Sequence, residues 1–360
     1  MKQLQNKLKL AKKALNKSVS AINPNIYDEL NKKDDNPAFV GVKNTNQIPD
    51  EIIERIWKDT KMAWLTVDKA SSKGRAIDTD LHNPLTYRLM TGSTSGGPIN
   101  ILKGINDVAI GTDGGGSVLA PAMSCQLPSV IGAGVGLYVN RKKRSTEGQE
   151  FTGSIGVIAK EITTVKEITE SLLANSLTRR SEKPLKVMIP EKGSVICPDG
   201  RDMQEKVMTY FSRIENGSYA TEKMHMSGIA ERTQGMSVVK DAFENKQADI
   251  ILTHEGPIDV YGYGETIPMT FGAIGQDITK NHGKYLIRAA NMCQTTAITV
   301  PTKDLASGLV IIANRGIENA KAAFRLATEL ENVIHLPEVW KRYFLMDQLD
   351  DSLNLKERWE

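Results

Sequence analysis

Short apolar runs that alternate with amphipathic stretches constrain the fold of this chain more than any other feature of its sequence. The apolar runs occupy residues 38–43, 63–67, 183–190, 248–253, 295–301 and 308–314. Amphipathic stretches such as 202–214, between two of these runs, and 317–331, after the last of them, have the periodicity of helices. Strands that alternate with helices are typical of α/β folds. We therefore expect an α/β fold with a central mixed β-sheet that is covered by helices on both faces.

The 360 residues divide into a main domain and two flanking segments. Apolar residues recur at intervals of three and four from Leu4 to Ile22, which predicts an amphipathic helix that ends at Asn23 and Pro24. The sequence has no internal repeat and no low-complexity linker, which favours one compact domain. We therefore expect an N-terminal helical arm over residues 1–37, a single domain over 38–335 and a C-terminal helical extension over 336–360.

Charge, cysteine content and hydropathy restrict where the protein works and what it binds. The formal charge of +3 is too small to indicate nucleic-acid binding. The three cysteines are far apart and odd in number, which fits a reducing cytoplasm better than a disulfide framework. No apolar run is long enough to span a membrane, and the N-terminus lacks the features of a signal peptide. We therefore expect a cytoplasmic protein that binds neither nucleic acid nor a membrane.

Two clusters of small residues, at 92–97 and 114–117, require a chemical explanation. Neither cluster is followed by the lysine of a phosphate-binding loop. The segment 132–137 ends in leucine where a dinucleotide fingerprint has glycine, and Leu119 replaces the second glycine of a nucleophile elbow. His254 and the residue after it are not followed by the second histidine of a zinc motif. We therefore expect no cofactor and no metal ion.

Three glycines directly before Ser117 point to carbonyl chemistry. Residues without a Cβ atom permit a tight turn in which backbone N–H groups converge on one point. Such amides can form an oxyanion hole, with Ser117 as the nucleophile. The five histidines stand in unremarkable sequence contexts, so none is an obvious base. A Ser-Lys variant of the triad is the alternative, in which Ser93 supplies a hydroxyl and Lys43, at the end of a predicted strand, supplies an amine.

The segment from residue 91 to 122 resembles the signature of the amidase signature family. It contains GSTSGG, GTDGGGS and a following PA, and Ser93 and Ser117 are in register with the bridging serine and the nucleophile of the family. Further segments that resemble the family are 39–46, 63–71, 153–168, 248–257 and 291–316. The resemblance therefore extends over most of the chain, from residue 38 to residue 332.

This resemblance implies a Ser-cisSer-Lys triad. Ser117 would be the nucleophile, Ser93 the bridging serine, and Lys43 the base. The peptide bond between Gly92 and Ser93 would be cis. The amides of the oxyanion hole would come from Ser117 and from the three glycines before it, Gly114, Gly115 and Gly116.

Three lysines upstream of Ser93 are candidates for the base. Lys43 has to be uncharged to accept a proton, and burial at a strand end lowers the pKa of a lysine from about 10.4. The segment between Lys43 and Ser93 is shorter than is usual in the family, so Lys69 and Lys73 remain alternatives. We prefer Lys43 because of its place at the end of a strand.

The function that follows from the resemblance is hydrolysis of a carboxamide C–N bond through an acyl-enzyme intermediate. The substrate would be a small-molecule amide, and the protein could form a homodimer. Two alternatives remain open. One is an amidotransferase-like or acyl-transferring enzyme of the same family, and the other is a non-catalytic member that serves as a binding module.

The sequence also suggests a preference among amides. Leu119 stands where many members of the family have arginine, and a leucine cannot hold a substrate carboxylate. We therefore expect a preference for neutral amides, unless another cation such as Arg288 reaches the pocket. The pocket wall is expected to include Tyr261, Tyr263, Met269 and Phe271.

Overall fold

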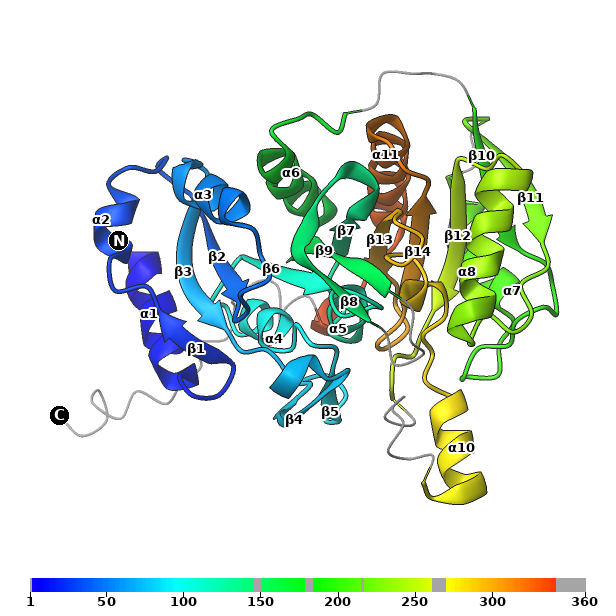
Figure 1. The fold of residues 1–360 in the computed structure, drawn as a ribbon, viewed down its shortest axis with the longest axis horizontal. Coiled ribbons are helices and arrows are strands. Elements are labelled where there is room, and N and C mark those ends of the chain that lie inside the picture. Colours follow the sequence, from blue (N-terminus) through cyan, green and yellow to red (C-terminus); the bar gives the residue numbers. More distant parts are fainter. Residues whose placement is uncertain (1, 145–149, 179–183, 215–216, 261–269, 341–360) are drawn as a thin grey trace.

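A mixed twelve-stranded β-sheet runs through the computed structural model, which describes residues 2–144, 150–178, 184–214, 217–260 and 270–340 (Figure 1). Its strands are β1 (Val19–Ile22), β2 (Ala38–Lys43), β3 (Met62–Asp68), β6 (Val108–Asp113), β7 (Ser129–Gly132), β8 (Tyr138–Arg144), β9 (Glu150–Ala159), β10 (Leu185–Pro190), β11 (Tyr219–Met224), β12 (Ile250–Glu255), β13 (Thr296–Pro301) and β14 (Gly308–Ala313). Their order is β1-β3-β2-β6-β9-β7-β13-β14-β12-β10-β11, and β8 pairs with β9. A separate two-stranded sheet consists of β4 (Ile77–His82) and β5 (Leu89–Thr91).

Two blocks of parallel strands are joined by antiparallel ones. β2 is parallel to both β3 and β6, and β10 is parallel to both β11 and β12. The strands between these blocks, from β9 to β14, pair antiparallel. The mixed sheet expected from the sequence is therefore confirmed.

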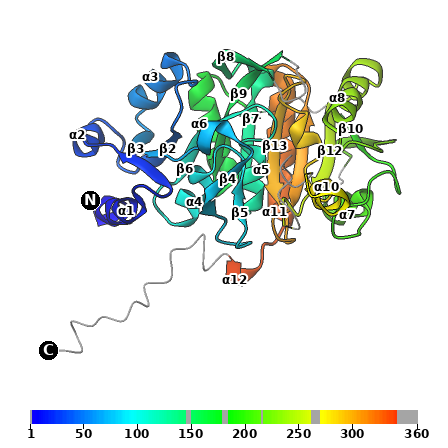
Figure 2. The same cartoon turned by 60° about the horizontal axis from the view of Figure 1, so that its bottom comes forward.

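Helices cover both faces of this sheet. The helices are α1 (Lys2–Ala14), α2 (Ile26–Leu30), α3 (Asp50–Lys58), α4 (Gly96–Leu102), α5 (Leu119–Ser124), α6 (Ile162–Leu173), α7 (Met203–Phe211), α8 (Arg232–Lys240), α10 (Gly272–Lys280), α11 (Ile317–Val333) and α12 (Glu338–Trp340). Figures 1 and 2 show α1 and α2 at one end of the sheet, beyond β3, and α7 and α8 at the other end.

The strand residues alternate between two cores, one on each face. On β12, Ile250 and Leu252 belong to the core that includes side chains of α3, α6 and α11. Ile251, between them, belongs to the core that includes side chains of α4, α5 and α8. Because side chains of a strand point alternately to its two faces, strands buried on both faces read as continuous apolar runs. This explains why the apolar runs in the sequence located the strands.

The N-terminal segment differs from the predicted helical arm. Its first helix ends at Ala14, and Val19–Ile22 form strand β1, which pairs antiparallel with β3 at the edge of the main sheet. Val19 is fully buried there. A β-branched residue next to an unpaired sheet edge can form backbone hydrogen bonds with that edge. The helical spacing of the apolar residues in this segment gives no sign of such pairing. The prediction of one helix up to Ile22 is therefore wrong.

The C-terminal segment is described as far as Trp340, within the short helix α12. The remainder of the extension predicted over 336–360, from residue 341 on, lies outside the described residues. In the described part of the chain, no helix is both long and apolar enough to cross a membrane.

The topology brings the two loops of small residues together. β2 and β6 are parallel neighbours, with Val42 beside Ile110, so their carboxyl ends meet at the same edge of the sheet. Lys43 ends β2, and Asp113 ends β6 and leads into the glycine loop. The loop before α4 carries Ser93 to the same edge, where it contacts Lys43.

Candidate active site

Lys43 is a buried side chain that contacts the first loop of small residues. It is 6% exposed, and its Nζ donates to Ser93 Oγ over 2.7 Å. Nζ also donates to Thr112 Oγ1 at 3.0 Å and to the Thr112 carbonyl at 3.3 Å. The structure therefore brings together two of the three residues expected for the triad.

The two alternative lysines lie elsewhere. Lys69 Nζ pairs with Asp78 Oδ1 at 3.1 Å and with Asp80 Oδ2 at 2.6 Å. Asp78 also accepts a hydrogen bond from Ser95 Oγ, so the cluster around Asp78 holds the loop that carries Ser93 in place. Lys73 is exposed in a short turn at 72–74. The geometry therefore favours Lys43 over both alternatives.

The peptide bond between Gly92 and Ser93 is trans. The cis bond in the described residues is the one between Gly256 and Pro257. Gly92 turns the chain at this point with a φ of +76°, and a Cβ atom there would lie 2.5 Å from the ring of Pro121. The expectation of a cis bond at Ser93 is therefore wrong, because the positive φ of Gly92 provides the bend with a trans bond.

Asp113 organises the glycine loop. Its buried carboxylate accepts hydrogen bonds from the amides of Gly116 at 2.7 Å, Val118 at 2.6 Å and Leu119 at 3.2 Å. Burial raises the pKa of Asp113, and these hydrogen bonds oppose that rise. Because its N–H already has a partner, Gly116 does not offer a donor to an oxyanion, contrary to expectation. It is also buried, whereas Gly115 and Ser117 are partly exposed.

The ring of Phe151 packs against Gly114. A Cβ atom on Gly114 would lie 2.6 Å from the ring of Phe151. Its carbonyl accepts a hydrogen bond from Nδ2 of Asn291 at 3.2 Å, and the same Nδ2 donates to the carbonyl of Thr152. Asn291 is fully buried, so the loop is fixed at both of its ends.

Ser117 lies beside the Ser93 loop without joining its hydrogen-bond chain. The amide of Thr94 donates to the carbonyl of Ser117 at 3.2 Å. In the described residues, no hydrogen bond connects Ser93 Oγ with Ser117 Oγ. Of the two contacts that the expected relay needs, the one between Ser93 and Lys43 is thus formed and the one between Ser117 and Ser93 is not. Catalytic hydrogen bonds are often looser in the absence of substrate than in its complex.

Glu255, which was not identified from the sequence, fixes a turn that lies against the glycine loop. Glu255 and its neighbour His254 are fully buried at the end of β12. The Glu255 carboxylate accepts from the amides of Tyr285 at 2.6 Å and Ile287 at 3.2 Å. Burial raises the pKa of Glu255 to about 7. These bonds fix the turn η4 (Leu286–Arg288), and a Cβ atom on Gly116 would lie 3.5 Å from the Ile287 carbonyl.

Leu119 does not form a pocket wall. It is fully buried in α5 and belongs to the core beneath the loop. Its expected role beside the substrate is therefore wrong, because α5 turns the side chain toward the sheet. Of the expected pocket residues, Phe271 is 69% exposed and Tyr261, Tyr263 and Met269 lie outside the described residues.

Asp68 lies beside Lys43 and carries a carboxyl group with a raised pKa. It is paired with Lys43 in the ladder of β2 and β3. Its Oδ1 accepts hydrogen bonds from Thr66 Oγ1 and Asn100 Nδ2, each at 2.7 Å, and from Asn106 Nδ2 at 3.2 Å. Burial nevertheless raises the pKa of Asp68 from 3.8 to about 7. The folded state therefore holds a proton on Asp68 that the unfolded chain releases at lower pH.

This proton makes folding stability depend on pH. Between pH 4 and 7 the folded state binds more protons than the unfolded state, so the free energy of unfolding falls as pH rises through this window. We expect Asp68→Asn to flatten this fall by up to about 1.4 kcal/mol per pH unit. Denaturant unfolding at pH 5, 6 and 7 measures the slope. The exposed Asp35→Asn is the control, and an equal slope in Asp68→Asn and wild type would contradict the assignment.

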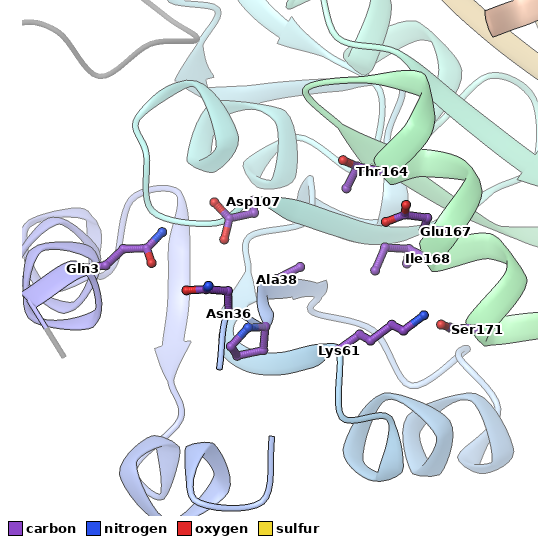
Figure 3. Close-up of a pocket in the computed structure, with 10 residues that line it drawn as sticks. Gln3, Asn36, Ala38, Lys61, Asp107, Thr164, Glu167, Ile168 and Ser171 are labelled. Atoms are coloured by element: carbon purple, nitrogen blue, oxygen red, sulfur yellow. The ribbon is translucent and has the colours of Figure 1, made fainter. Parts of the chain in front are cut away.

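A cavity elsewhere in the molecule is not part of this site. It has a volume of about 520 Å³ and is lined by Lys61, Asp107 and Glu167, among others (Figure 3). Ala38 also lines it, and Ala38 begins β2 whereas Lys43 ends it, a distance of about 16 Å along the strand. In the part of the chain that the structure describes, no group of three His, Cys, Asp or Glu side chains could hold a metal ion.

Known proteins share this fold. No family model matches the chain. A curated fatty acid amide hydrolase from Medicago truncatula is 28% identical over 166 residues, which are 44% of this chain and 26% of that protein. The matched region thus spans about a quarter of that relative.

Among solved structures, an amidase has a TM-score of 0.59 at 13% identity, over 92% of this chain and 96% of its own. A glutamyl-tRNA(Gln) amidotransferase subunit from Thermotoga maritima has a TM-score of 0.63 at 17% identity, over 94% of both chains. A peptide amidase in complex with chymostatin has a TM-score of 0.62 at 11% identity, over 93% of this chain and 95% of its own. The resemblance first seen in residues 91–122 is thereby confirmed, and the chain has the fold of the amidase signature enzymes.

Proposed function

We propose that this protein is an amidohydrolase that cleaves the C–N bond of a small-molecule carboxamide, with Ser117 as nucleophile. The observation that carries the proposal is the contact between the buried Nζ of Lys43 and Ser93 Oγ at 2.7 Å. The loop that holds Ser93 also donates a backbone hydrogen bond to Ser117, so the three side chains belong to one local structure. The names of the amidases and amide hydrolases with this fold or a similar sequence support the same reaction class.

The proposed reaction begins with attack of Ser117 Oγ on the substrate carbonyl. As the C–O bond forms, the proton of Ser117 moves to Ser93 and the proton of Ser93 moves to the uncharged amine of Lys43. The same chain then returns a proton to the leaving nitrogen, and the C–N bond breaks. Water hydrolyses the acyl-Ser117 ester, which releases the acid and restores the serine.

The glycine loop would stabilise the tetrahedral intermediate. Its oxygen carries negative charge, and preorganised backbone N–H groups stabilise such charge. The amides of Gly115 and Ser117 are the proposed donors, because both residues are partly exposed and the amide of Gly116 is bonded to Asp113. Asp113 would therefore shape the oxyanion hole without contacting the substrate.

An amide panel tests the proposed reaction. The protein is incubated with primary amides of varied acyl groups, and ammonia and carboxylic acid are both quantified. We expect equal amounts of the two products. A shortfall of acid when hydroxylamine is present, matched by hydroxamate, would show that the acyl group also passes to an acceptor other than water. Absence of ammonia from every amide, with no reaction of Ser117 with a fluorophosphonate, would contradict the proposal.

A further inference from the structure

A buried ion pair lies beside the loop that carries Ser93. Nζ of Lys284 and Oδ2 of Asp259 are 2.8 Å apart, and the two side chains are 7% and 5% exposed. The same Oδ2 accepts a hydrogen bond from Oγ1 of Thr91 at 2.6 Å. Thr91 is the last residue of β5, and Gly92 alone separates it from Ser93. The pair therefore reaches the Ser93 loop from parts of the chain that are far away in sequence.

Backbone hydrogen bonds fix the two partners of this pair relative to each other. The amide of Asp259 donates to the carbonyl of His282 at 3.0 Å, and the amide of Gly256 donates to the carbonyl of Gly283 at 2.8 Å. The amide of Lys284 in turn donates to Nδ1 of His282 at 2.8 Å. Because these bonds join the two segments directly, the carboxylate of Asp259 has a defined position.

Asp259 combines an uncommon backbone conformation with a buried charged group. Its φ is +48°, in the left-handed region that a residue with a Cβ atom seldom adopts. Burial raises the pKa of its carboxyl, and the charge of Lys284 opposes that rise. A buried carboxylate is costly unless it is paired and hydrogen-bonded. Residues held in such conformations by their surroundings are concentrated at functional sites.

The strand that leads to Ser93 belongs to a small sheet that needs support from the rest of the molecule. β4 and β5 form a two-stranded sheet apart from the main one, and such a hairpin is only marginally stable by itself (Figure 1). Asn83, in the connection between these strands, donates to the carbonyl of Ser124 at 2.8 Å and ties one end of the hairpin to α5. The hydrogen bond from Thr91 to Asp259 ties down the end that leads to Ser93.

Gly92 makes the position of Ser93 sensitive to this second tie. It has a φ of +76° and lacks a side chain that would restrict its rotation. On its far side, the amide of Thr94 donates to the carbonyl of Ser117 at 3.2 Å. A displacement of Thr91 would therefore pass through one flexible residue to the contacts of the Ser93 loop.

We infer that Asp259 and Lys284 are positioning residues for the proposed reaction. Through Thr91 they hold Ser93 Oγ against Lys43 Nζ. The inference rests on the proposed function, in which Ser93 passes a proton to Lys43. Such a relay needs hydrogen-bond distance at each step, and a displacement of about 1 Å can lower a rate about 10²-fold. Asp259 and Lys284 themselves transfer no proton.

Thr91→Val tests the hydrogen bond to Asp259, because valine has the shape of threonine and no hydroxyl. For the best primary amide of the panel, we expect kcat to fall about 10- to 100-fold while KM stays near its wild-type value. Labelling of Ser117 by a fluorophosphonate should slow in parallel. Thr91→Ser restores the hydroxyl and should keep kcat within about 3-fold of wild type, less than a typical hydrogen bond contributes.

A matched threonine is the control for this variant. Thr169 is 1% exposed on α6, and its Oγ1 donates to the carbonyl of Val165 at the same distance of 2.6 Å. α6 packs on the other face of the sheet, so Thr169→Val should have the wild-type kcat and labelling rate. An equal loss in Thr169→Val and Thr91→Val would overturn the inference, since any lost buried hydroxyl would then have the same effect.

Lys284→Met tests the ion pair, because methionine has a similar length and no charge. We expect kcat to fall, with KM again near its wild-type value. The losses in Lys284→Met and Thr91→Val should not multiply in the double variant, because both act through the carboxylate of Asp259. Lys7→Met is the control, since it removes a buried ammonium group that pairs with Asp107 at the same 2.8 Å. Losses that multiply would overturn the inference.

Hydrogen exchange separates this inference from the proposed reaction. Exchange of the Thr94 amide is compared in wild type and Thr91→Val, and we expect it to be faster in the variant. If wild type hydrolyses amides, an unchanged kcat in Thr91→Val overturns the inference alone. If wild type hydrolyses none, the proposed function fails and the exchange rate decides. Faster exchange then upholds the role of Asp259 in holding the Ser93 loop, and unchanged exchange overturns it as well.

Discussion

Ser117→Ala is expected to abolish amide hydrolysis, with a loss in kcat of at least about 10⁴-fold, comparable to the loss of a serine nucleophile in other hydrolases. The substitution removes the attacking oxygen but leaves the backbone of the loop unchanged. Asp113 bonds to the amides of Gly116 and Val118, and neither bond uses the Ser117 side chain. The free energy of unfolding should therefore change by less than about 1 kcal/mol. Ammonia release and denaturant unfolding measure the two quantities.

A matched serine shows that the effect is local. Ser72 is exposed in the turn at 72–74, and Ser72→Ala should have wild-type activity and stability. Ser117→Ala activity within tenfold of wild type would mean that another residue attacks the substrate. An inactive Ser117→Ala that is also unfolded would contradict the account of the loop, in which Asp113 and not Ser117 holds the backbone.

Lys43→Met is expected to lower kcat by about 10²- to 10⁴-fold, the usual contribution of a general base. Methionine has a similar length, so it fills the space between Ser93 and Thr112 without supplying a proton acceptor. Lys43→Arg discriminates further, because arginine keeps the charge but does not give up its proton in proteins. Both variants should also react slowly with a fluorophosphonate, since the nucleophile is no longer activated. Rates of ammonia release and of covalent labelling measure these effects.

The control for this prediction is Lys73→Met, at the exposed alternative lysine, which should retain wild-type activity. Full activity in Lys43→Arg would show that Lys43 contributes only its charge. Full activity in Lys43→Met, with a large loss in Lys69→Met, would move the base to the cluster around Asp78.

The strands of the sheet could be predicted because the pattern that identifies each strand lies within its own residues. Each buried strand is a continuous apolar run, since its side chains enter the cores on both faces. The Val19–Ile22 strand could not be read in this way. Its residues fit a helical period, and they form a strand because the edge of β3 is there to pair with them. Pairing with a strand that is distant in the sequence cannot be predicted from the residues of the segment alone.

The candidate site was predictable to the extent that motif spacing determines it. Lys43 was selected for its position at the end of a predicted strand, and Ser93 for its position in a loop of small residues. Nζ of Lys43 and Oγ of Ser93 lie 2.7 Å apart in the structure. The catalytic roles proposed for the two residues remain predictions. The motif spacing gave a wrong prediction for Leu119. A position in a motif does not determine whether a side chain of α5 points toward the substrate or into the core. Glu255 was missed because tertiary packing alone brings it to the turn at 286–288, which lies against the glycine loop.

The site of covalent attachment of a fluorophosphonate tests the central claim most directly. Wild-type protein is treated with the probe, digested, and sequenced by tandem mass spectrometry. The account predicts one adduct, on the Oγ of Ser117, which is absent from Ser117→Ala and forms more slowly in Lys43→Met. An adduct on a different residue, or steady amide hydrolysis by protein that carries no adduct at Ser117, would contradict it.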